Sequence, residues 1–378
     1  MAFITLNTEK LKDNFDYLND KFQQNGIEWS VVAKVLCGNR KYLEHLIGLG
    51  INEICDSRIS NLKIIKSIDP GIRTVFIKPP AKRNAAKIVK YADVSFNTEY
   101  ETIKALSEEA IKQQRLHKVV IMIELGELRE GVMRGQFIEF YSNVFQLPGI
   151  EVIGIGTNLT CMYGVLPNHD KLIQLCLYKQ LIEARFDKII PYISGGASVT
   201  IPLIDKGLLP KGVNHFRVGE TLFLGTDVYN SKPFQQMHND AFKLYAEIIE
   251  LNEKPIIPTG ELGQNLAGHT HSFDENLLGA SSLRAIVDVG LLDVEEGHIK
   301  PVAKNMHIAG ASSDMIVIDL GSNPRNLKVG DLIEFSLDYM GLLRLMNSDY
   351  IEKRFESELS VYSLDATMEV AEDNRKIA

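Results

Sequence analysis

Short runs of apolar and β-branched residues alternate with longer stretches of helical period through the first two thirds of the chain. This alternation is typical of βα units built around a parallel sheet. Eight such runs occur, at residues 31–35, 52–55, 73–78, 93–96, 118–124, 151–157, 189–193 and 214–218. Eight successive units predict a closed (β/α)8 barrel of the TIM type, and an open doubly wound sheet is the structural alternative.

The sequence changes character after Asp227. Gly, Pro and His collect in the stretch PIIPTGELGQNLAGHTHSFDENLLG, and β-rich segments with little helical period follow it: LRAIVDVGLLDV, HIKPVA, SDMIVIDLG and DLIEFSL. We therefore predict an α/β barrel domain at residues 1–228, a second, mostly β C-terminal domain at residues 229–360, and a flexible tail at residues 361–378.

Composition and charge limit the classes of partner. The chain has 378 residues, a length that suits two domains, and a net charge of −8 without a cluster of Lys and Arg. This distribution argues against a nucleic-acid or membrane surface, so we expect a small-molecule partner or a second copy of the chain.

The N-terminal residues, the cysteines and an HxH motif bear on localisation and metal binding. The opening residues lack the basic and apolar regions of a signal peptide, and no segment has the ~18 uninterrupted apolar residues of a membrane helix. The four cysteines form no CxxC pair, so we expect reduced thiols in a cytoplasmic protein. His269 and His271 form an HxH motif, but no Cys or carboxylate accompanies them at ligand spacing, so we expect no metal site.

Lys34 ends the first apolar run, in the stretch SVVAKVLCGN, and the chain breaks at Gly38 just beyond it. A lysine at the carboxyl end of a barrel strand is a candidate for an amine that forms a Schiff base, because desolvation there lowers its pKa and frees the nucleophile. A strand end that has simply reached water is the alternative interpretation.

Two loops carry small residues and hydroxyl groups suited to an anion. Residues 194–198 (SGGAS) and 217–221 (RVGET) follow the seventh and eighth runs. Barrel enzymes hold phosphate with the loops after strands 7 and 8, through backbone N–H groups at helix starts. The two loops, opposite a lysine on the first strand, therefore predict a phosphate site.

These stretches resemble a known family. VVAKVLCGN, DSRISNLK, IELGELREGVM, GIGTNLTCMYGV, SGGAS, HFRVGETLFLG and GASSDMIVID are similar to the corresponding blocks of the alanine racemase superfamily of fold-type III pyridoxal-phosphate enzymes, and most similar to its ornithine racemase branch. The resemblance covers residues 1–355. It implies a pyridoxal 5'-phosphate cofactor and a barrel followed by a β domain.

The resemblance assigns a role to two central residues. Lys34 matches the lysine that forms the Schiff base with the cofactor and acts as base on one face of Cα. Arg217 matches the arginine that faces the pyridine nitrogen. A permanent cation there keeps the nitrogen unprotonated, which makes the ring a weaker electron sink and suits racemisation.

The remaining cofactor contacts follow from the same blocks. Arg129, in LREG, matches the arginine that contacts the phenolate oxygen of the ring. Ser198 matches the phosphate cup, as do Gly219 and Glu220 through their backbone N–H groups. Tyr339, in SLDYMG, matches a tyrosine that the second domain directs toward the phosphate.

Departures from alanine racemase are also informative. Met122 replaces a lysine that is often carbamylated, so we expect no carbamate. Asn158 replaces a histidine among the cofactor-binding residues, and Ala197 replaces an asparagine. The segment that carries the second base of alanine racemase reads Gly-Leu-Leu-Asp-Val at residues 290–294 and contains no tyrosine.

A racemase needs an acid or base on each face of Cα, so another residue must replace that tyrosine. Our hypothesis is Ser313 in GASSD, and the other candidates are Ser312, Cys161, Tyr163 and Tyr339. The superfamily forms its site between two subunits, which implies a homodimer with shared active sites in which GASSD comes from the partner.

The predicted function is an amino-acid racemase that interconverts L- and D-enantiomers through a Schiff base and deprotonation of Cα. The ornithine branch implies ornithine or another basic substrate, whose distal ammonium needs a carboxylate such as Glu124, Glu127 or Asp56. Three alternatives remain: an alanine, serine or broad-specificity racemase, a fold-type III decarboxylase, and a non-catalytic pyridoxal-phosphate-binding protein.

Overall fold

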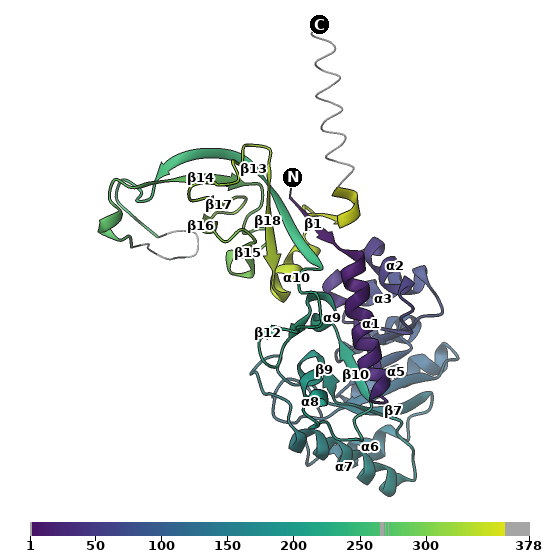
Figure 1. Cartoon of the computed structure of the whole chain (residues 1–378). Helices are drawn as coiled ribbons and strands as arrows, with labels where there is room; N and C mark the ends of the chain where they lie inside the picture. The colour runs from purple at the N-terminus through teal and green to yellow at the C-terminus, as the bar shows by residue number, and fades with distance from the viewer. Residues whose placement is uncertain (1, 265–267, 269, 271, 360–378) are drawn as a thin grey trace, which may run out of the picture. The chain divides into compact units, whose positions relative to one another are not determined.

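The computed structural model describes residues 2–264, 268, 270 and 272–359. The chain divides into two compact units: residues 11–239 form one, and residues 1–10 with the segment from residue 240 onward form the other (Figure 1). The HxH pair and the tail at residues 361–378 lie outside the described residues.

The first unit is the predicted barrel, built on a parallel sheet with the order β8-β7-β6-β5-β4-β3-β2-β10-β9. All eight predicted runs form strands. Its strands are β2 (Glu28–Val32), β3 (Glu53–Asp56), β4 (Arg73–Phe76), β5 (Val94–Asn97), β6 (His117–Met122), β7 (Ile150–Gly156), β8 (Tyr192–Ser194), β9 (Gly196–Ala197) and β10 (His215–Val218).

The sheet closes through residues 192–197. The first part of this stretch, β8, pairs with β7, whereas the second part, β9, pairs with β10, which in turn pairs with β2. Gly196 permits this closure, because a Cβ atom there would lie 2.2 Å from the ring of Phe216. The closed (β/α)8 architecture is therefore confirmed, and the open sheet is wrong.

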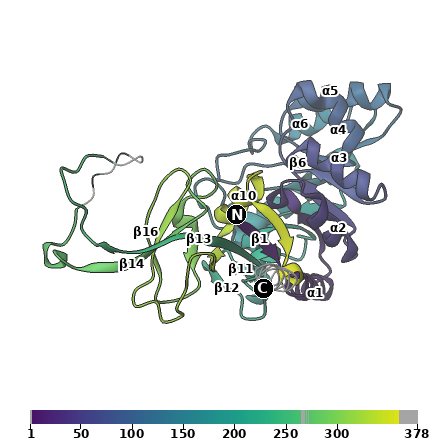
Figure 2. The same ribbon diagram turned by 90° about the horizontal axis from the view of Figure 1, so that it is seen from above.

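Helices follow the strands around the outside of the sheet, and Figure 2 shows α2 to α5 in succession there. Asn39 and Asn168 cap α2 and α7 by accepting backbone N–H groups. The helices of this part are α1 (Thr8–Gln24), α2 (Arg40–Gly48), α3 (Ile59–Ile68), α4 (Ala85–Tyr91), α5 (Tyr100–Lys112), α6 (Phe137–Val144), α7 (His169–Phe186), α8 (Ile201–Asp205) and α9 (Glu220–Leu224).

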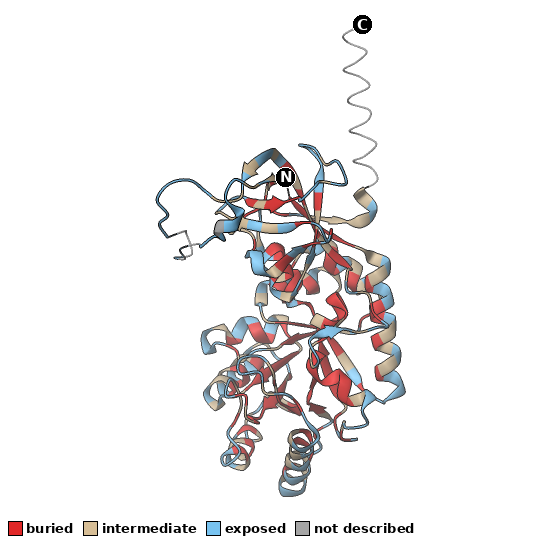
Figure 3. Ribbon diagram, turned by 60° about the vertical axis from the view of Figure 1, so that its left-hand side comes forward, coloured by how far each residue is buried: buried red, intermediate tan, exposed pale blue. Residues whose placement is uncertain are grey.

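The barrel interior contains two kinds of side chain. An apolar cluster of alternate strand residues packs inside the sheet, which is largely red in Figure 3. Its buried members are Val32, Cys55, Val75, Val94, Phe96, Val120, Met122 and Ile153. The remaining inward positions include Ser30, Ser194, His215 and Arg217, all buried. A buried polar group is costly unless it is hydrogen-bonded, so this polar part of the core requires an explanation.

The second unit is a mostly β domain, as predicted, with the path β15-β18-β13-β14-β17-β16. The four predicted β-rich segments supply β14, β15, β17 and β18, whereas the long β13, β16 and helix α10 were not predicted. Its elements are β13 (Phe242–Pro255), β14 (Ser281–Val287), β15 (Ile299–Pro301), β16 (His307–Ala311), β17 (Ile316–Asp319), β18 (Leu332–Leu337), α10 (Tyr339–Asn347) and β19 (Glu352–Phe355).

The first strand of the chain, β1 (Phe3–Leu6), differs from the expectation that residues 1–228 form the barrel. It pairs antiparallel with β13 and parallel with β19, so it belongs to the sheet of the second unit. All four of its residues are buried. A short apolar strand carries no local information about which sheet it joins, because that choice depends on pairing partners far along the chain.

Candidate active site at the mouth of the barrel

Lys34 lies just beyond the end of β2, in the 3-10 helix Ala33–Leu36. Its side chain is exposed, so the expectation that Lys34 ends the strand is wrong. The strand ends at Val32 because the chain turns there, and Cys37 follows the 3-10 helix with a left-handed φ of 49°. Lys34 is therefore presented at the carboxyl end of the sheet, where barrel enzymes place their chemistry.

Asp56, at the end of the neighbouring strand β3, is buried and lies within the electrostatic reach of Lys34. Burial raises the pKa of the Asp56 carboxyl, whereas hydrogen bonds from Asn61 and Arg58 and the charge of Lys34 oppose that rise. The carboxylate accepts the Asn61 amide at 3.1 Å and the Arg58 N–H at 2.8 Å. These bonds hold Asp56 at the base of the loop that follows β3.

The two predicted phosphate loops are adjacent. Ser198 is buried, and its hydroxyl accepts the backbone N–H of Thr221 at 3.3 Å, which joins the loop after β9 to the start of α9. Gly219 lies against the end of β2, because a Cβ atom there would be 2.9 Å from the carbonyl oxygen of Val32. Glu220, half-buried, is the first residue of α9. The proposed phosphate cup therefore lies beside the strand that leads to Lys34.

Arg217 is buried inside the barrel on β10, two residues before Gly219. Its Nη1 donates to the Ser194 carbonyl at 2.8 Å and also to the Ser194 hydroxyl, and its Nη2 donates to the Thr157 carbonyl at 2.8 Å. The guanidinium carbon lies 5.0 Å from the centre of the Phe96 ring. Burial lowers the pKa of Arg217, but a guanidinium stays protonated in proteins.

Arg129 and Glu130 form a bidentate pair in the loop after β6. This hydrogen bonding raises the pKa of Arg129. The Glu130 carboxylate also accepts the Asn158 amide at 3.4 Å, and the same amide lies 3.7 Å from the sulfur of Cys161. The sequence analysis missed Glu130, whose only signal was its place directly after Arg129 in LREG.

Glu127 organises the loop that carries Cys161 and Tyr163. It is 1% exposed, and burial alone would raise its pKa, but hydrogen bonds from backbone N–H groups lower that pKa to about 2. Its carboxylate accepts five such groups, from Thr160, Cys161, Met162, Tyr163 and Val165. Glu127 is therefore committed to the protein backbone, and the hypothesis that it reads a substrate ammonium loses its basis.

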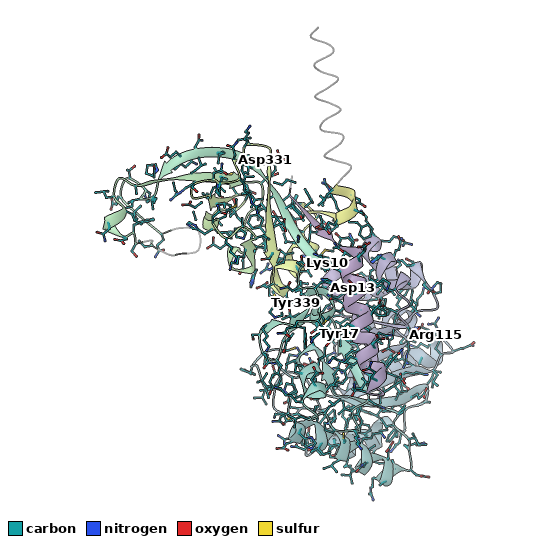
Figure 4. All side chains as sticks on the ribbon, in the orientation of Figure 1. Lys10, Asp13, Tyr17, Arg115, Asp331 and Tyr339 are labelled. Carbon is teal, nitrogen blue, oxygen red and sulfur yellow. The ribbon has the colours of Figure 1, made fainter. Side chains whose placement is uncertain are left out.

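The other candidates for the second acid or base are distributed between the units. Cys161 and Tyr163 are exposed and lie in the barrel unit. Ser312 and Ser313 lie in the second unit, as does Tyr339, which begins α10 and is half-buried (Figure 4). The structure thus collects the cofactor candidates of the barrel at one mouth and holds the remaining residues on the β domain.

Ser313 occupies a tight turn between β16 and β17. Its hydroxyl donates to the Asp314 carboxylate at 2.7 Å, and the Ser312 hydroxyl donates to the Met315 carbonyl at 3.1 Å. The turn packs against Gly290, where a Cβ atom would lie 2.4 Å from the Ser313 carbonyl oxygen. The N–H of Leu291 donates to the Ser312 carbonyl at 2.9 Å. The serines therefore lie directly beside the segment that lacks the expected tyrosine.

No group of three or more His, Cys, Asp and Glu side chains in the described part of the chain could hold a metal ion. No described helix is long and apolar enough to span a membrane.

Comparisons with known proteins agree with this geometry. Residues 6–227 match the family model described as alanine racemase, N-terminal domain. The chain is 36% identical to ornithine racemase of Acetoanaerobium sticklandii, over 93% of this chain and 98% of the relative. It is 30% identical to lysine racemase of Thermotoga maritima, over 94% of this chain and 99% of the relative.

Solved structures share the fold at low sequence identity. Alanine racemase from Streptomyces coelicolor superposes with a TM-score of 0.71 at 13% identity, covering 94% of this chain and 98% of the other. Alanine racemase from Bartonella henselae with covalently bound pyridoxal phosphate gives a TM-score of 0.69 at 15% identity, covering 94% of this chain and 99% of the other. The chain therefore belongs to the alanine racemase family.

Proposed function

We propose that this amino-acid racemase uses pyridoxal 5'-phosphate and acts on ornithine or another basic amino acid. The observation that carries the proposal is the grouping of an amine, a phosphate-type loop pair and a buried guanidinium at one end of a closed barrel. Similarity to ornithine and lysine racemases along nearly the full length of each chain supports the basic substrate.

The residues at the mouth fit this cofactor. Gly219 meets the end of β2 so closely that a side chain would collide with Val32, which brings the phosphate-type loop beside the strand leading to Lys34. The hydroxyl of Ser198 and the N–H groups of the first turn of α9 are the donor types that bind phosphate. Arg217 supplies a cation inside the barrel, between the loop and the apolar core.

In this proposal Lys34 would hold the cofactor covalently, Ser198, Gly219 and Glu220 would bind its phosphate, and Arg129 and Asn158 would contact its ring. When bound, pyridoxal phosphate withdraws electrons from Cα of the amino acid and so makes the Cα proton acidic. Lys34 removes or returns that proton on one face. Arg217 would donate a hydrogen bond toward the pyridine nitrogen and keep its own proton.

A second proton donor serves the opposite face, and we assign it to Ser313 of the partner subunit in a homodimer. The Asp314 carboxylate, which accepts the hydrogen bond of Ser313, supports this assignment because it can take up the hydroxyl proton. Ser312, Cys161, Tyr163 and Tyr339 are the alternatives. Tyr339 is also the proposed phosphate contact from the second domain, and the assembly is proposed to function in the cytoplasm.

A decarboxylase of the same fold would need an acidic group against the pyridine nitrogen. The buried Arg217, bonded to two carbonyl oxygens, opposes that reading. The racemase with a basic substrate is therefore the stronger proposal.

The test is a chiral assay across the common L- and D-amino acids with the wild type and with Lys34→Ala. We expect interconversion of ornithine or lysine by the wild type and a loss of several orders of magnitude in the variant, because no other amine replaces the covalent step. Borohydride treatment with pyridoxal phosphate adds the mass of the cofactor to the Lys34 peptide. A wild type that racemises no amino acid, or added mass on another lysine, would refute the proposal.

The role of Ser313 is tested by solvent-deuterium entry into each enantiomer separately. Ser313→Ala should slow entry from one enantiomer more than from the other, because only one face loses its acid. Equal loss from both enantiomers, or no loss, removes the assignment.

A further inference from the structure

A continuous chain of hydrogen bonds runs through the barrel from Arg217 toward the amino ends of the strands. The Arg217 guanidinium donates to the Ser194 hydroxyl, which lies 2.7 Å from Nδ1 of His215. On the other side of the imidazole, Nε2 lies 3.1 Å from the Ser30 hydroxyl and 3.3 Å from Oε1 of Glu53. The Ser30 hydroxyl donates to that same oxygen at 2.6 Å.

The donors of this chain fit one arrangement in which the Ser194 hydroxyl both accepts and donates a hydrogen bond. Arg217 is always a donor, so the Ser194 oxygen accepts its N–H and the Ser194 proton is left to donate to Nδ1 of His215. Nδ1 is then an acceptor, and the proton of the neutral imidazole is on Nε2, where it faces Ser30 and Glu53. In this arrangement His215 is the Nε2–H tautomer, and this is the tautomer that we infer.

Glu53 anchors the far end as an anion. Its second oxygen lies 2.9 Å from Nε of Arg73. Burial alone would raise the pKa of Glu53, but the hydrogen bonds from His215 and Ser30 and the charge of Arg73 lower it. Glu53, Arg73 and His215 also line a cleft of about 330 Å³ together with Glu28 and Trp29. The chain of bonds thus begins at a polar cleft formed by the amino ends of the strands.

Arg217 itself meets neutral acceptors. Within the part of the chain that the structure describes, it donates to the Ser194 carbonyl and hydroxyl and to the Thr157 carbonyl, and none of these acceptors is a carboxylate. Its positive charge is therefore not cancelled by a direct ion pair. The carboxylate of Glu53 reaches it only through His215 and Ser194, which fixes the direction of the guanidinium and leaves its charge available.

We propose that Ser194, His215 and Glu53 are positioning residues that hold the Arg217 guanidinium toward the cofactor ring. This inference rests on the proposed role of Arg217 and gives a function to His215, to Glu53 and to the Ser194 hydroxyl. The buried polar part of the barrel core is then explained, because a satisfied network specifies one orientation of the arginine.

The chain offers a matched control on the outer side of the same sheet. His117 is buried on β6 and lies 2.8 Å from the Ser95 hydroxyl, which also accepts the amide of Asn97 at 2.9 Å. Asn97, Ser95 and His117 thus repeat the order of donor, serine and histidine, and none of their described hydrogen bonds reaches Arg217. His117→Gln removes a comparable buried bond and reports the purely structural cost.

The first measurement is the ¹⁵N spectrum of the histidine rings, with the His215 signals identified from their loss in His215→Gln. We expect Nε2 to carry the proton in the wild type, and Ser194→Ala to change the His215 signals while leaving those of His117 in place. A proton on Nδ1 of His215 would overturn the proposal, whether or not the protein is active.

The second measurement compares kcat and the visible absorbance of the pyridoxal-phosphate enzyme. A hydrogen bond to a charged group contributes enough that Ser194→Ala should lower kcat about tenfold to about a hundredfold, whereas Ser194→Thr restores the hydroxyl and the rate. His117→Gln should leave kcat within about twofold of wild type. Equal effects of Ser194→Ala and His117→Gln on kcat and absorbance would overturn the proposal.

These results distinguish a failure of the proposed racemase function from a failure of the positioning role. If His215→Gln fails to fold, Ser194→Ala still tests whether the network positions Arg217, because it removes only one oxygen atom. A wild type without cofactor binding or racemisation would refute the proposed function, and the tautomer of His215 would then decide alone whether the chain of bonds exists. A racemising wild type with an unaffected Ser194→Ala would refute only the positioning role.

Discussion

The Glu127 carboxylate binds five backbone N–H groups of the loop at residues 160–165, and its contribution can be worked out from the structure. Five backbone N–H groups converge on two oxygen atoms, and the pKa of the carboxyl falls from its usual 4.5 to about 2. That difference corresponds to about 3 kcal/mol of folded-state stability, and solvent near the exposed loop reduces it to about 2 kcal/mol.

The sign of the pH dependence follows from the lowered pKa. The folded state favours the charged carboxylate, so the stabilisation is complete above pH 4.5 and is lost as the pH falls through about 2. In Glu127→Gln the single amide oxygen cannot accept five hydrogen bonds, and the amide NH₂ group, itself a donor, faces backbone N–H donors. We expect the variant to lose about 2 kcal/mol at pH 7 and to lack this part of the acid dependence.

Amide hydrogen exchange and denaturant unfolding at several pH values measure this effect. Exchange at Cys161, Met162 and Tyr163 should accelerate about tenfold or more in Glu127→Gln, while the barrel strands keep their protection. Glu124→Gln is the matched control, because Glu124 is also buried but its carboxylate accepts only the N–H of Gly126 in the described contacts. Unchanged loop exchange in Glu127→Gln, or the same acceleration in Glu124→Gln, would refute the reasoning.

Three further predictions concern stability. Gly131→Ala should destabilise the loop that carries Arg129 by about 2 kcal/mol in denaturant unfolding, since φ is 145° and a Cβ atom would lie 2.3 Å from the N of Glu124. Gly196→Ala should prevent closure of the barrel or lower its melting temperature markedly, because its Cβ would overlap Phe216; an unchanged melting temperature contradicts this. His117, whose pKa burial lowers from 6.5 to about 4, stays neutral in the folded state while the unfolded state takes up a proton. Stability should therefore fall by up to about 3 kcal/mol between pH 6.5 and 4, and His117→Gln should remove this loss.

Much of the barrel could be predicted from the local pattern of apolar and polar residues. Each of the eight apolar runs became a strand, because a parallel strand covered by helices reads as a short β-branched run. The ends of the strands were harder to predict from the sequence. The first run was expected to continue to residue 35, but β2 ends at Val32 and the next residues form a 3-10 helix. The earlier end of β2 is the reason why Lys34 is exposed. The hydrophobic pattern of the sequence gives no sign of where the strand ends.

The candidate site was accessible in part because its residues lie in blocks that resemble a family. Lys34, Ser198, Arg217 and Gly219 were named from those blocks, and the structure places them near one mouth. The roles of Glu130 and Glu127 could not be predicted from the sequence. A carboxylate in a loop looks the same in sequence whether it binds a ligand, pairs with an arginine or accepts backbone N–H groups.

The sequence by itself determined the alternation of strands and helices, the change to a β domain after Asp227, and the membership of the family. Only the tertiary structure decided that β1 joins the sheet of the second unit and that Ser30 and His215, 185 positions apart, share a hydrogen bond. The physical reason is that periodicity reports which face of an element is buried. It does not report which distant element covers that face, or which donors and acceptors meet there.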